Sequence, residues 1–542
     1  WRIRLNTPLK LCFKTNNKRD SMLFFWEDFA TNLNYFWDAL VNFWWSSRRI
    51  QTTFLTDEQI LKNVLNDKKT YWTFSEEERV KRLMELNEIW KETFNEYLKE
   101  RELKNEELKI NKQNKLYYNK EINSLTEEDS EYKNEEEIYK EVQLLEMIDT
   151  VLENVNIEDE EIIDAEGNYV IPGGIDVHTH FHLDVGIAVS SDDFRTGTIA
   201  AACGGTTSII DHIGQGPKGQ TLYDPINHYH ELADGKAVID YGFHGVIPYG
   251  VGDNTLEEME KLIDDGIESF KIYMTYGQMV DDDDSIKILK LAKDKGGIIT
   301  VHPENNDTIN YLKKYYSTNG MTSAVYHPKS RPEECEGEAI NRILNIAHLV
   351  GDAPIYIVHL SSKLGMDYIK MARDRGQKNI YVETCPQYLV LDDKKYELPN
   401  NEGLKYIMSP PLRDKANQEP LWRAVREGDI QVIATDHCPF LFKKEKLPMG
   451  KDDFTKCPNG APGVETRMPV IFSEGVMKGR ISINKFVEVT STNPAKIYGM
   501  YPQKGTIAVG SDADIVIIDK NKEVTITKSM LHENVDYTPY EG

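Results

Sequence analysis

Short apolar and β-branched runs alternate with amphipathic helical segments eight times between residues 174 and 478. This alternation constrains the fold most, because strands that are separated by helices pair in parallel. We expect strands at 174–178, 206–213, 238–247, 269–274, 297–302, 355–359, 380–384 and 430–435. We expect helices at 193–203, 225–232, 256–265, 285–295, 338–350, 364–375, 419–427 and 467–478. The pattern predicts an α/β fold, a (β/α)8 TIM barrel, and the alternative is an open doubly wound sheet.

No nucleotide-binding signature supports the open sheet. No GxGxxG motif opens a helix in this chain, and the phosphate-binding motif GxxxxGK[ST] does not occur. The formal net charge of −25 also disfavours nucleic acid or an anionic membrane as a partner. The six cysteines are scattered without a CxxC pair, which indicates free thiols in a reducing compartment, so we expect a cytoplasmic protein.

Residues 1–143 depart from the barrel pattern. Apolar residues between 25 and 43 recur at helical spacing, although acidic residues interrupt the stretch and make it a poor membrane span. The segment from 75 to 120 is helical and highly charged, and 121–141 is strongly acidic like a solvated linker. We expect a helical, charged N-terminal extension, partly disordered and of unknown role, which a gene fusion or a mis-joined reading frame would explain.

Polar side chains that can bind metal stand at the ends of five expected strands. They are His178 and His180, Lys271, His302, His359 and Asp436. In a (β/α)8 barrel the carboxyl ends of the strands meet at one mouth, where the chemistry takes place. Side chains at i and i+2 of a strand point the same way, so His178 and His180 can bind one ion. A lone HxH is a weak signal, but five such strand ends together predict a metal centre.

Lys271 lies in the apolar run 270–274, where an unpaired ammonium would carry a large desolvation cost. A neutral lysine amine can react with CO2 to give a carbamate, an anion that bridges two cations about 3.5–4 Å apart. We therefore expect N6-carboxylysine at Lys271 and two divalent ions. The expected ligands are His178, His180, Lys271 and Asp436 on one ion, and Lys271, His302 and His359 on the other. Imidazole and carboxylate ligands suit zinc best, while manganese, iron and cobalt also fit.

Ten motifs closely resemble the cyclic amidohydrolases of the dihydropyrimidinase and D-hydantoinase (D-phenylhydantoinase) group, among them PGGIDVHTH, GIESFKIYMTYG, ITVHPEN, YIMSPPLR, VIATDHCPF and PNGAPGVETRMP. The resemblance implies a metal-dependent barrel with a small β-sandwich from the chain ends, assembled as a homotetramer or homodimer. It divides the chain into the extension (1–143), a lead-in with part of the sandwich (144–172), the barrel (173–499) and a truncated return of the sandwich (500–542).

The resemblance also implies roles at the site. Tyr276 would bind the substrate and stabilise the oxyanion, and Asp436 would transfer the proton. The main chain at Ser409 and Asn459 would bind the imide edge of the ring. The implied reaction opens the cyclic amide of a dihydropyrimidine or a 5-substituted hydantoin to an N-carbamoyl amino acid, by attack of a metal-bridging hydroxide. His182, Cys385 and His437 lie beside these motifs, and we interpret them as supporting residues.

Three related functions are the alternatives. A dihydroorotase would carry an arginine two positions after the HxH pair, where this chain has His182. A non-catalytic scaffold protein of the same family would have lost metal ligands, and none is missing here. An allantoinase-like cyclic amidase stays open, although Tyr276 with the SPPLR and PNGAPGVE motifs favours a dihydropyrimidinase. The preferred ring and its stereochemistry also stay open.

Overall fold

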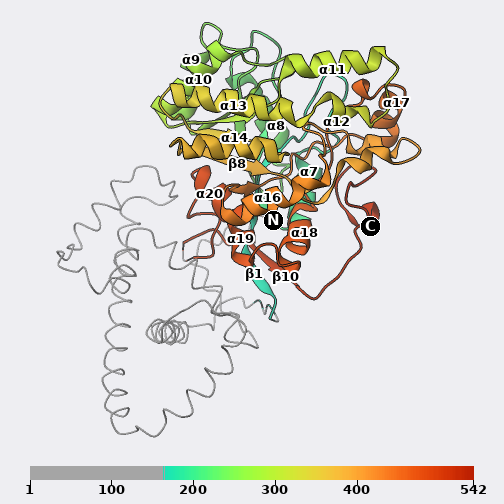
Figure 1. Ribbon diagram of the computed structural model, residues 1–542. Helices are drawn as coiled ribbons and strands as arrows, with labels where there is room; N and C mark the ends of the chain where they lie inside the picture. The colour runs from blue at the N-terminus through green and yellow to red at the C-terminus, as the bar shows by residue number, and fades with distance from the viewer. Residues whose placement is uncertain (1–162, 164, 166, 509) are drawn as a thin grey trace, which may run out of the picture. The chain divides into compact units, whose positions relative to one another are not determined.

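A parallel sheet of eight strands forms the centre of this computed structural model, which describes residues 163, 165, 167–508 and 510–542 (Figure 1). Each strand pairs in parallel with the next one along the chain. The strands are β2 (Gly174–Thr179), β3 (Thr206–His212), β4 (Asp240–Val246), β5 (Ser269–Tyr273), β6 (Ile298–His302), β7 (Ile355–Ile357), β8 (Ile380–Thr384) and β9 (Val432–Ile433). Thr179 forms a parallel bridge with His437, just after β9. The two ends of the sheet therefore meet, which confirms the predicted barrel architecture.

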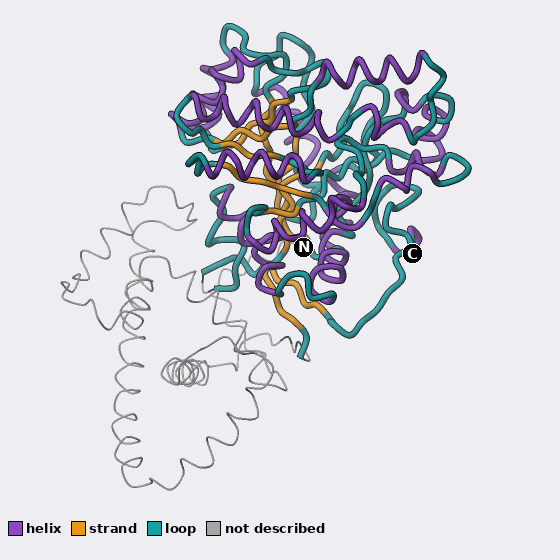
Figure 2. Tube along the Cα trace, viewed as in Figure 1, coloured by secondary structure: helices purple, strands orange, loops and turns teal. Residues whose placement is uncertain are grey.

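Helices cover the outside of this sheet, and Figure 2 shows them around the strands. They are α7 (Phe194–Cys203), α8 (Tyr223–Ala233), α9 (Thr255–Asp264), α10 (Asp282–Lys295), α11 (Asn306–Thr318), α12 (Tyr326–Ser330), α13 (Glu333–Leu349), α14 (Lys363–Asp374), α15 (Pro386–Val390), α16 (Gln418–Glu427), α17 (Leu447–Gly450), α18 (Arg467–Ile471), α19 (Ile483–Val487) and α20 (Asn493–Ile497). The expected helix at 467–478 is α18 followed by a π-helical stretch, Phe472–Met477.

Local sequence signals account for the ends of α10. The side chain of Asp281 accepts a hydrogen bond from the N–H of Asp284, and the first turn is acidic throughout. Negative charge at a helix N-terminus and lysines in its last turn both complement the helix dipole. Gly296 ends the helix with φ of 81°, a left-handed conformation that glycine adopts without steric cost. By contrast, α11 has no counterpart among the expected helices. Ile309 is its one buried residue, so the sequence shows no apolar stripe that would predict a helix there.

Two strands end two residues earlier than the sequence predicts, and both stop just before a proposed metal ligand. Strand β7 ends at Ile357 instead of 359, and β9 ends at Ile433 instead of 435. The backbone then turns into the left-handed region at His359 (φ 39°) and Asp436 (φ 56°). A strand cannot continue through such a residue, so the strand ends early and the side chain is aimed into the barrel mouth.

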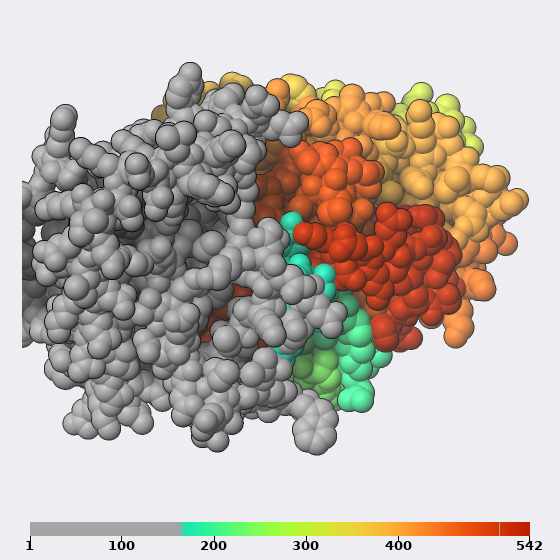
Figure 3. All heavy atoms as spheres, turned by 90° about the horizontal axis from the view of Figure 1, so that it is seen from below, coloured from blue at the N-terminus to red at the C-terminus, as the bar shows by residue number. Residues whose placement is uncertain are grey.

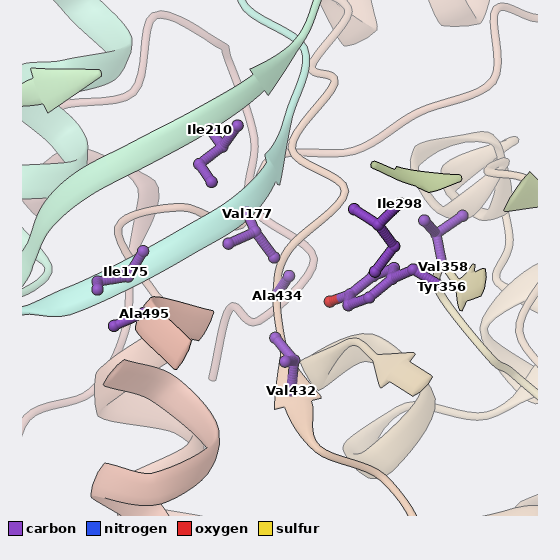
Figure 4. Packing of buried hydrophobic residues seen from close by; sticks show 9 residues of the cluster. All are labelled: Ile175, Val177, Ile210, Ile298, Tyr356, Val358, Val432, Ala434 and Ala495. Carbon is purple, nitrogen blue, oxygen red and sulfur yellow. The ribbon is translucent and has the colours of Figure 1, made fainter. Parts of the chain in front are cut away.

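Aliphatic side chains from several strands converge inside the barrel, as Figure 4 shows. The cluster comprises Ile175, Val177, Ile210, Ile298, Tyr356, Val358, Val432, Ala434 and Ala495. Burying each of the larger side chains is worth about 1.5–3 kcal/mol, so this cluster stabilises the scaffold of the site. Tyr356 reaches the site directly, because its hydroxyl donates to Glu383 Oε2 at 2.9 Å.

Segments from near the two ends of the described chain also pair. Strand β1 (Tyr169–Pro172) and β10 (Ile515–Ile518) form a two-stranded antiparallel sheet, and Figure 3 shows red atoms from near the C-terminus beside turquoise atoms from the start of the described chain. This sheet is the described part of the predicted sandwich. The predicted extension, 1–143, and most of the lead-in lie outside the described residues. No helix in the described part of the chain is long and apolar enough to cross a membrane.

Candidate metal centre

His178, His180 and Asp436 meet at the mouth of the barrel, where the first and last strands join. The Nε2 atoms of His178 and His180 lie 3.2 Å and 3.1 Å from Oδ1 of Asp436. The HxH spacing thus places both rings on one face of the strand. Two imidazoles and a carboxylate, with ligand atoms all within 4.8 Å of one another, form a candidate metal site.

A second pair of imidazoles lies beside this group. His359 Nε2 and His302 Nδ1 are 2.9 Å apart, and the His359 ring stacks 5.4 Å from the ring of His178. Burial, with His302 beside it, lowers the pKa of His359 well below its usual value, so this ring is neutral and has a lone pair for a metal. The Nδ1 atom of His359 is buried and has no hydrogen-bond partner among the described residues.

Lys271 is buried on β5, with 2% of its surface exposed. Burial lowers the pKa of its amine to about 8, although the charges of Asp436 and Glu383 oppose that shift. Its Nζ atom makes no hydrogen bond with any described residue and lies 5.4 Å from the centroid of the Tyr273 ring. An amine with this pKa is partly neutral near pH 7–8, as carbamate formation requires.

Two buried carboxylates that the sequence analysis did not assign support the histidines. Glu383, at the end of β8, accepts from Nδ1 of His178 at 2.6 Å. Glu304 lies two residues after β6 and accepts from Nε2 of His302 at 2.7 Å. Such carboxylates fix the ring orientation and tautomer of a metal-binding histidine. Their positions in ETCPQYL and ITVHPEN, next to candidate ligands, are the signal that could have revealed them.

Electrostatics at Asp436 favour the ionised form. Burial opposes ionisation, but the charge of His178 and hydrogen bonds from both HxH histidines hold the pKa of Asp436 well below its usual range. At His178, burial lowers the pKa while Glu383 and Asp436 raise it, with a net rise to about 9. His178 and Asp436 therefore form an ion pair.

Three candidate site residues adopt the left-handed backbone conformation. Tyr276 has φ of 72°, and His359 and Asp436 share the feature. This conformation costs about 1–3 kcal/mol in a non-glycine residue and persists only where the surroundings enforce it. Its concentration at one barrel mouth is a second indication, independent of the histidines, that this mouth is the functional site.

Tyr276 stands beside the second imidazole pair. Its ring centroid is 5.2 Å from that of His302, at an interplanar angle of 62°. Burial raises the pKa of its phenol, against the effect of the neighbouring Arg331 charge, so the hydroxyl keeps its proton. A protonated phenol here can donate a hydrogen bond to an oxygen bound at the histidines.

One buried lysine connects the segments that carry Ser409 and Asn459. The Nζ atom of Lys446 donates to the carbonyl oxygens of Ile407, Pro458 and Gly460, at 2.8, 3.1 and 2.6 Å. The N–H of Gly460 also donates to the carbonyl of Ile407 at 2.9 Å. All three donors of the ammonium are used, so the two segments are fixed relative to each other. Sequence reasoning missed Lys446, because nothing in the motif FKKEK distinguishes it from its neighbours.

The three residues interpreted as supporting differ in their positions. His437 is buried, and its Nδ1 accepts from the N–H groups of Gly463 and Val464 while Nε2 donates to Asp192 at 3.0 Å. Cys385 is buried at the start of α15. His182 is exposed and lies outside the histidine cluster.

With this geometry established, comparison with known proteins is informative. The profile of the amidohydrolase family matches residues 169–542, which include all ten strands described above. The chain belongs to the amidohydrolase family. The D-phenylhydantoinase of Escherichia coli O1:K1 is 51% identical to this amidohydrolase over 382 residues, 70% of this chain and 82% of the relative.

Two solved structures give the same result for the fold of this amidohydrolase. The dihydropyrimidinase from Brevibacillus agri NCHU1002 superposes with a TM-score of 0.70 at 49% identity, covering 72% of this chain and 84% of that one. The D-hydantoinase from Bacillus sp. AR9 also has a TM-score of 0.70, at 48% identity and the same coverage. The resemblance to the hydantoinase and dihydropyrimidinase group is thereby confirmed.

Proposed function

We propose that this amidohydrolase opens cyclic amides, either dihydropyrimidines or 5-substituted hydantoins, by hydrolysis. The observation that carries the proposal is the convergence of His178, His180 and Asp436 within 4.8 Å in a chain that is 51% identical to D-phenylhydantoinases. A dihydropyrimidine would give an N-carbamoyl-β-amino acid, and a hydantoin an N-carbamoyl-α-amino acid. In both cases one water is added and one ring C–N bond breaks.

The side chains present fit a pair of divalent ions, for which zinc is the first choice. Buried imidazole nitrogens that face one another, such as Nε2 of His359 and Nδ1 of His302 at 2.9 Å, are what a site for such ions requires. One ion would be held by His178, His180, Asp436 and a carboxylated Lys271, and the other by the same Lys271 with His302 and His359. Such ions supply Lewis acidity and lower the pKa of a bound water.

The chain's own residues perform the remaining steps. The ionised carboxylate of Asp436 takes the proton of the attacking water and returns it to the ring nitrogen that leaves. The phenol of Tyr276 donates a hydrogen bond to the carbonyl oxygen as it gains negative charge. The main chain at Ser409 and Asn459, fixed by Lys446, holds the imide edge so that the carbonyl carbon faces the attacking water.

The experiment is ring opening of dihydrouracil and of D- and L-5-phenylhydantoin by the zinc-loaded, full-length chain, with Asp436→Asn as the inactive control. We expect hydrolysis of at least one ring by the unchanged chain and none by the variant. Absence of hydrolysis with two metals bound per chain would refute the proposal. Allantoin as a fourth substrate tests the allantoinase-like alternative, and preferred opening of allantoin would favour it.

Two further expectations accompany this function. The homotetramer or homodimer implied by the resemblance stays a prediction, which light scattering on the purified chain would test. The scaffold alternative predicts neither metal binding nor turnover, so metal content measured by elemental analysis separates it from the enzyme.

A further inference from the structure

Arg331 lies in the connection between α12 and α13, and its guanidinium faces the ring of Tyr276. The Cζ atom of Arg331 is 5.3 Å from the centroid of that ring, and the arginine side chain is fully buried. Its Nη1 donates to Oε2 of Glu304, the same oxygen that accepts from Nε2 of His302. One carboxylate oxygen therefore connects the arginine beneath Tyr276 to a candidate metal ligand.

The main chain of Arg331 is fixed by contacts that do not involve Tyr276. Its N–H donates to the carbonyl of Pro328 at 3.2 Å, and its carbonyl accepts from Nη1 of Arg413. Arg413 in turn donates through Nε to Ser361 Oγ at 3.0 Å. The scaffold thus holds the main chain of Arg331, and Glu304 holds its guanidinium, so Tyr276 packs against a fixed group.

Part of the Arg331 guanidinium makes no hydrogen bond to a described residue. Its Nε and Nη2 atoms are buried and have no hydrogen-bond partner among the described residues. A buried cation is costly unless its charge is compensated. Besides Glu304, what faces this cation is an aromatic ring, whose negative face attracts a guanidinium.

The ring of Tyr276 needs a contact that fixes its orientation. Its backbone is left-handed and its side chain is half-buried, so local conformational preference does not fix the ring. The described ring contacts of Tyr276 are with His302 at 5.2 Å, with Tyr273 at 6.1 Å and with Arg331. Loss of the guanidinium would remove the cationic contact among these three and loosen the hold on the ring.

We propose that Arg331 is a positioning residue for Tyr276: its guanidinium, anchored by Glu304, holds the phenol ring against His302 so that the hydroxyl faces the reacting carbonyl. The inference rests on the proposed function for its catalytic consequence. Its structural content, the coupling between Arg331 and Tyr276, is independent of any substrate.

A double-mutant cycle tests the coupling. Arg331→Gln is expected to lower kcat by about ten- to a hundredfold with little change in KM, because the oxyanion donor is misplaced and substrate binding is not. In a Tyr276→Phe background, where no donor remains to be positioned, the same change should lower kcat by less than about twofold. Metal content should equal that of the unchanged chain throughout.

Arg373→Gln is the matched control. Arg373 on α14 is a partly buried arginine that donates to the carbonyls of Asp429 and Ile380, away from Tyr276. Its effect on kcat should be the same with and without Tyr276→Phe. If the losses of Arg331→Gln and Tyr276→Phe multiply instead, Arg331 acts on something else and the proposal is overturned.

A 19F NMR measurement tests the coupling between Arg331 and Tyr276 without relying on enzyme activity. In the chain labelled with 3-fluorotyrosine, the 19F resonance of Tyr276 is assigned by its loss in Tyr276→Phe. Arg331→Gln, or Arg331→Lys if the glutamine variant does not fold, should shift that resonance, and Arg373→Gln should not. An unshifted resonance overturns the proposal. A shifted resonance in a chain that opens no cyclic amide would instead sustain the coupling and refute the proposed function.

Discussion

Nδ1 of His178 donates a hydrogen bond to Oε1 of Glu383 inside the barrel, at 2.6 Å. This bond orients the ring so that its Nε2 faces Asp436. The same carboxylate accepts from the main-chain N–H of His359 at 3.0 Å and from the hydroxyl of Tyr356 at 2.9 Å. One buried acid thus holds the ring of His178 and the main chain of His359, one residue from each half of the candidate metal centre. A metal-bound imidazole that donates its second N–H to a carboxylate is a stronger ligand.

Replacing Glu383 by Gln is expected to weaken zinc binding by about 10–100-fold, because the amide orients His178 without adding to its basicity. Zinc retained per chain across a graded series of chelator concentrations would measure the loss. Glu397→Gln, at an exposed glutamate, is the control and should bind zinc like the unchanged chain. Equal zinc affinity in both variants would mean that Glu383 does not support the ligand.

Lys271→Ala should lose activity together with metal, because the proposed bridging carbamate could no longer form. A short carboxylic acid added to the variant should restore part of both, since it supplies the missing pair of oxygens. In the unchanged chain, labelling with 13C-bicarbonate should give a carbamate resonance that the variant lacks. Full metal loading of the unchanged chain without that resonance would contradict the bridge.

Lys446→Met should raise KM roughly tenfold or more while kcat falls less, since three carbonyl groups lose their common donor and the two segments proposed to bind substrate shift apart. Steady-state kinetics on the preferred cyclic amide separates the two constants. Lys444→Met, at an exposed lysine of the same stretch, should leave both unchanged. A fall in kcat alone would place the effect of Lys446 on the chemical step.

Stability should depend on pH through Glu533. Burial, with Asp192 and Glu465 nearby, raises its pKa from 4.5 to about 7, although His437 opposes the rise. The folded chain therefore binds this proton more tightly than the unfolded chain, and the stability it contributes is complete below about pH 4.5 and is lost as pH rises through about 7.

Glu533→Gln removes this dependence, because the amide is neutral at every pH. Relative to the unchanged chain, the variant should gain up to about 3 kcal/mol in free energy of unfolding between about pH 5 and pH 8. Urea midpoints of both chains at the two pH values give the difference. A constant difference across this range would show that Glu533 does not titrate as described.

Periodicity and strand-end position sufficed to predict the eight strands, most of the helices and the residues that now lie together at the barrel mouth. These signals are local, since each is read within about ten residues. Glu383 was missed because its partner, His178, lies 205 positions away in the sequence. Arg331 and Lys446 were missed for the same reason: a buried cation looks like a surface cation until the carbonyls and rings around it are known.

The closure of the sheet at Thr179 and His437 determines when, during synthesis of the chain, the candidate metal centre can form. The carbonyl of His178 accepts from Thr435 Oγ1 at 3.1 Å, although 257 positions separate the two residues. A ribosome therefore releases the first histidines of the centre long before it reaches Asp436. Metal capture by the complete proposed ligand set would have to wait for the last barrel strand, so metal uptake would report that the barrel has closed.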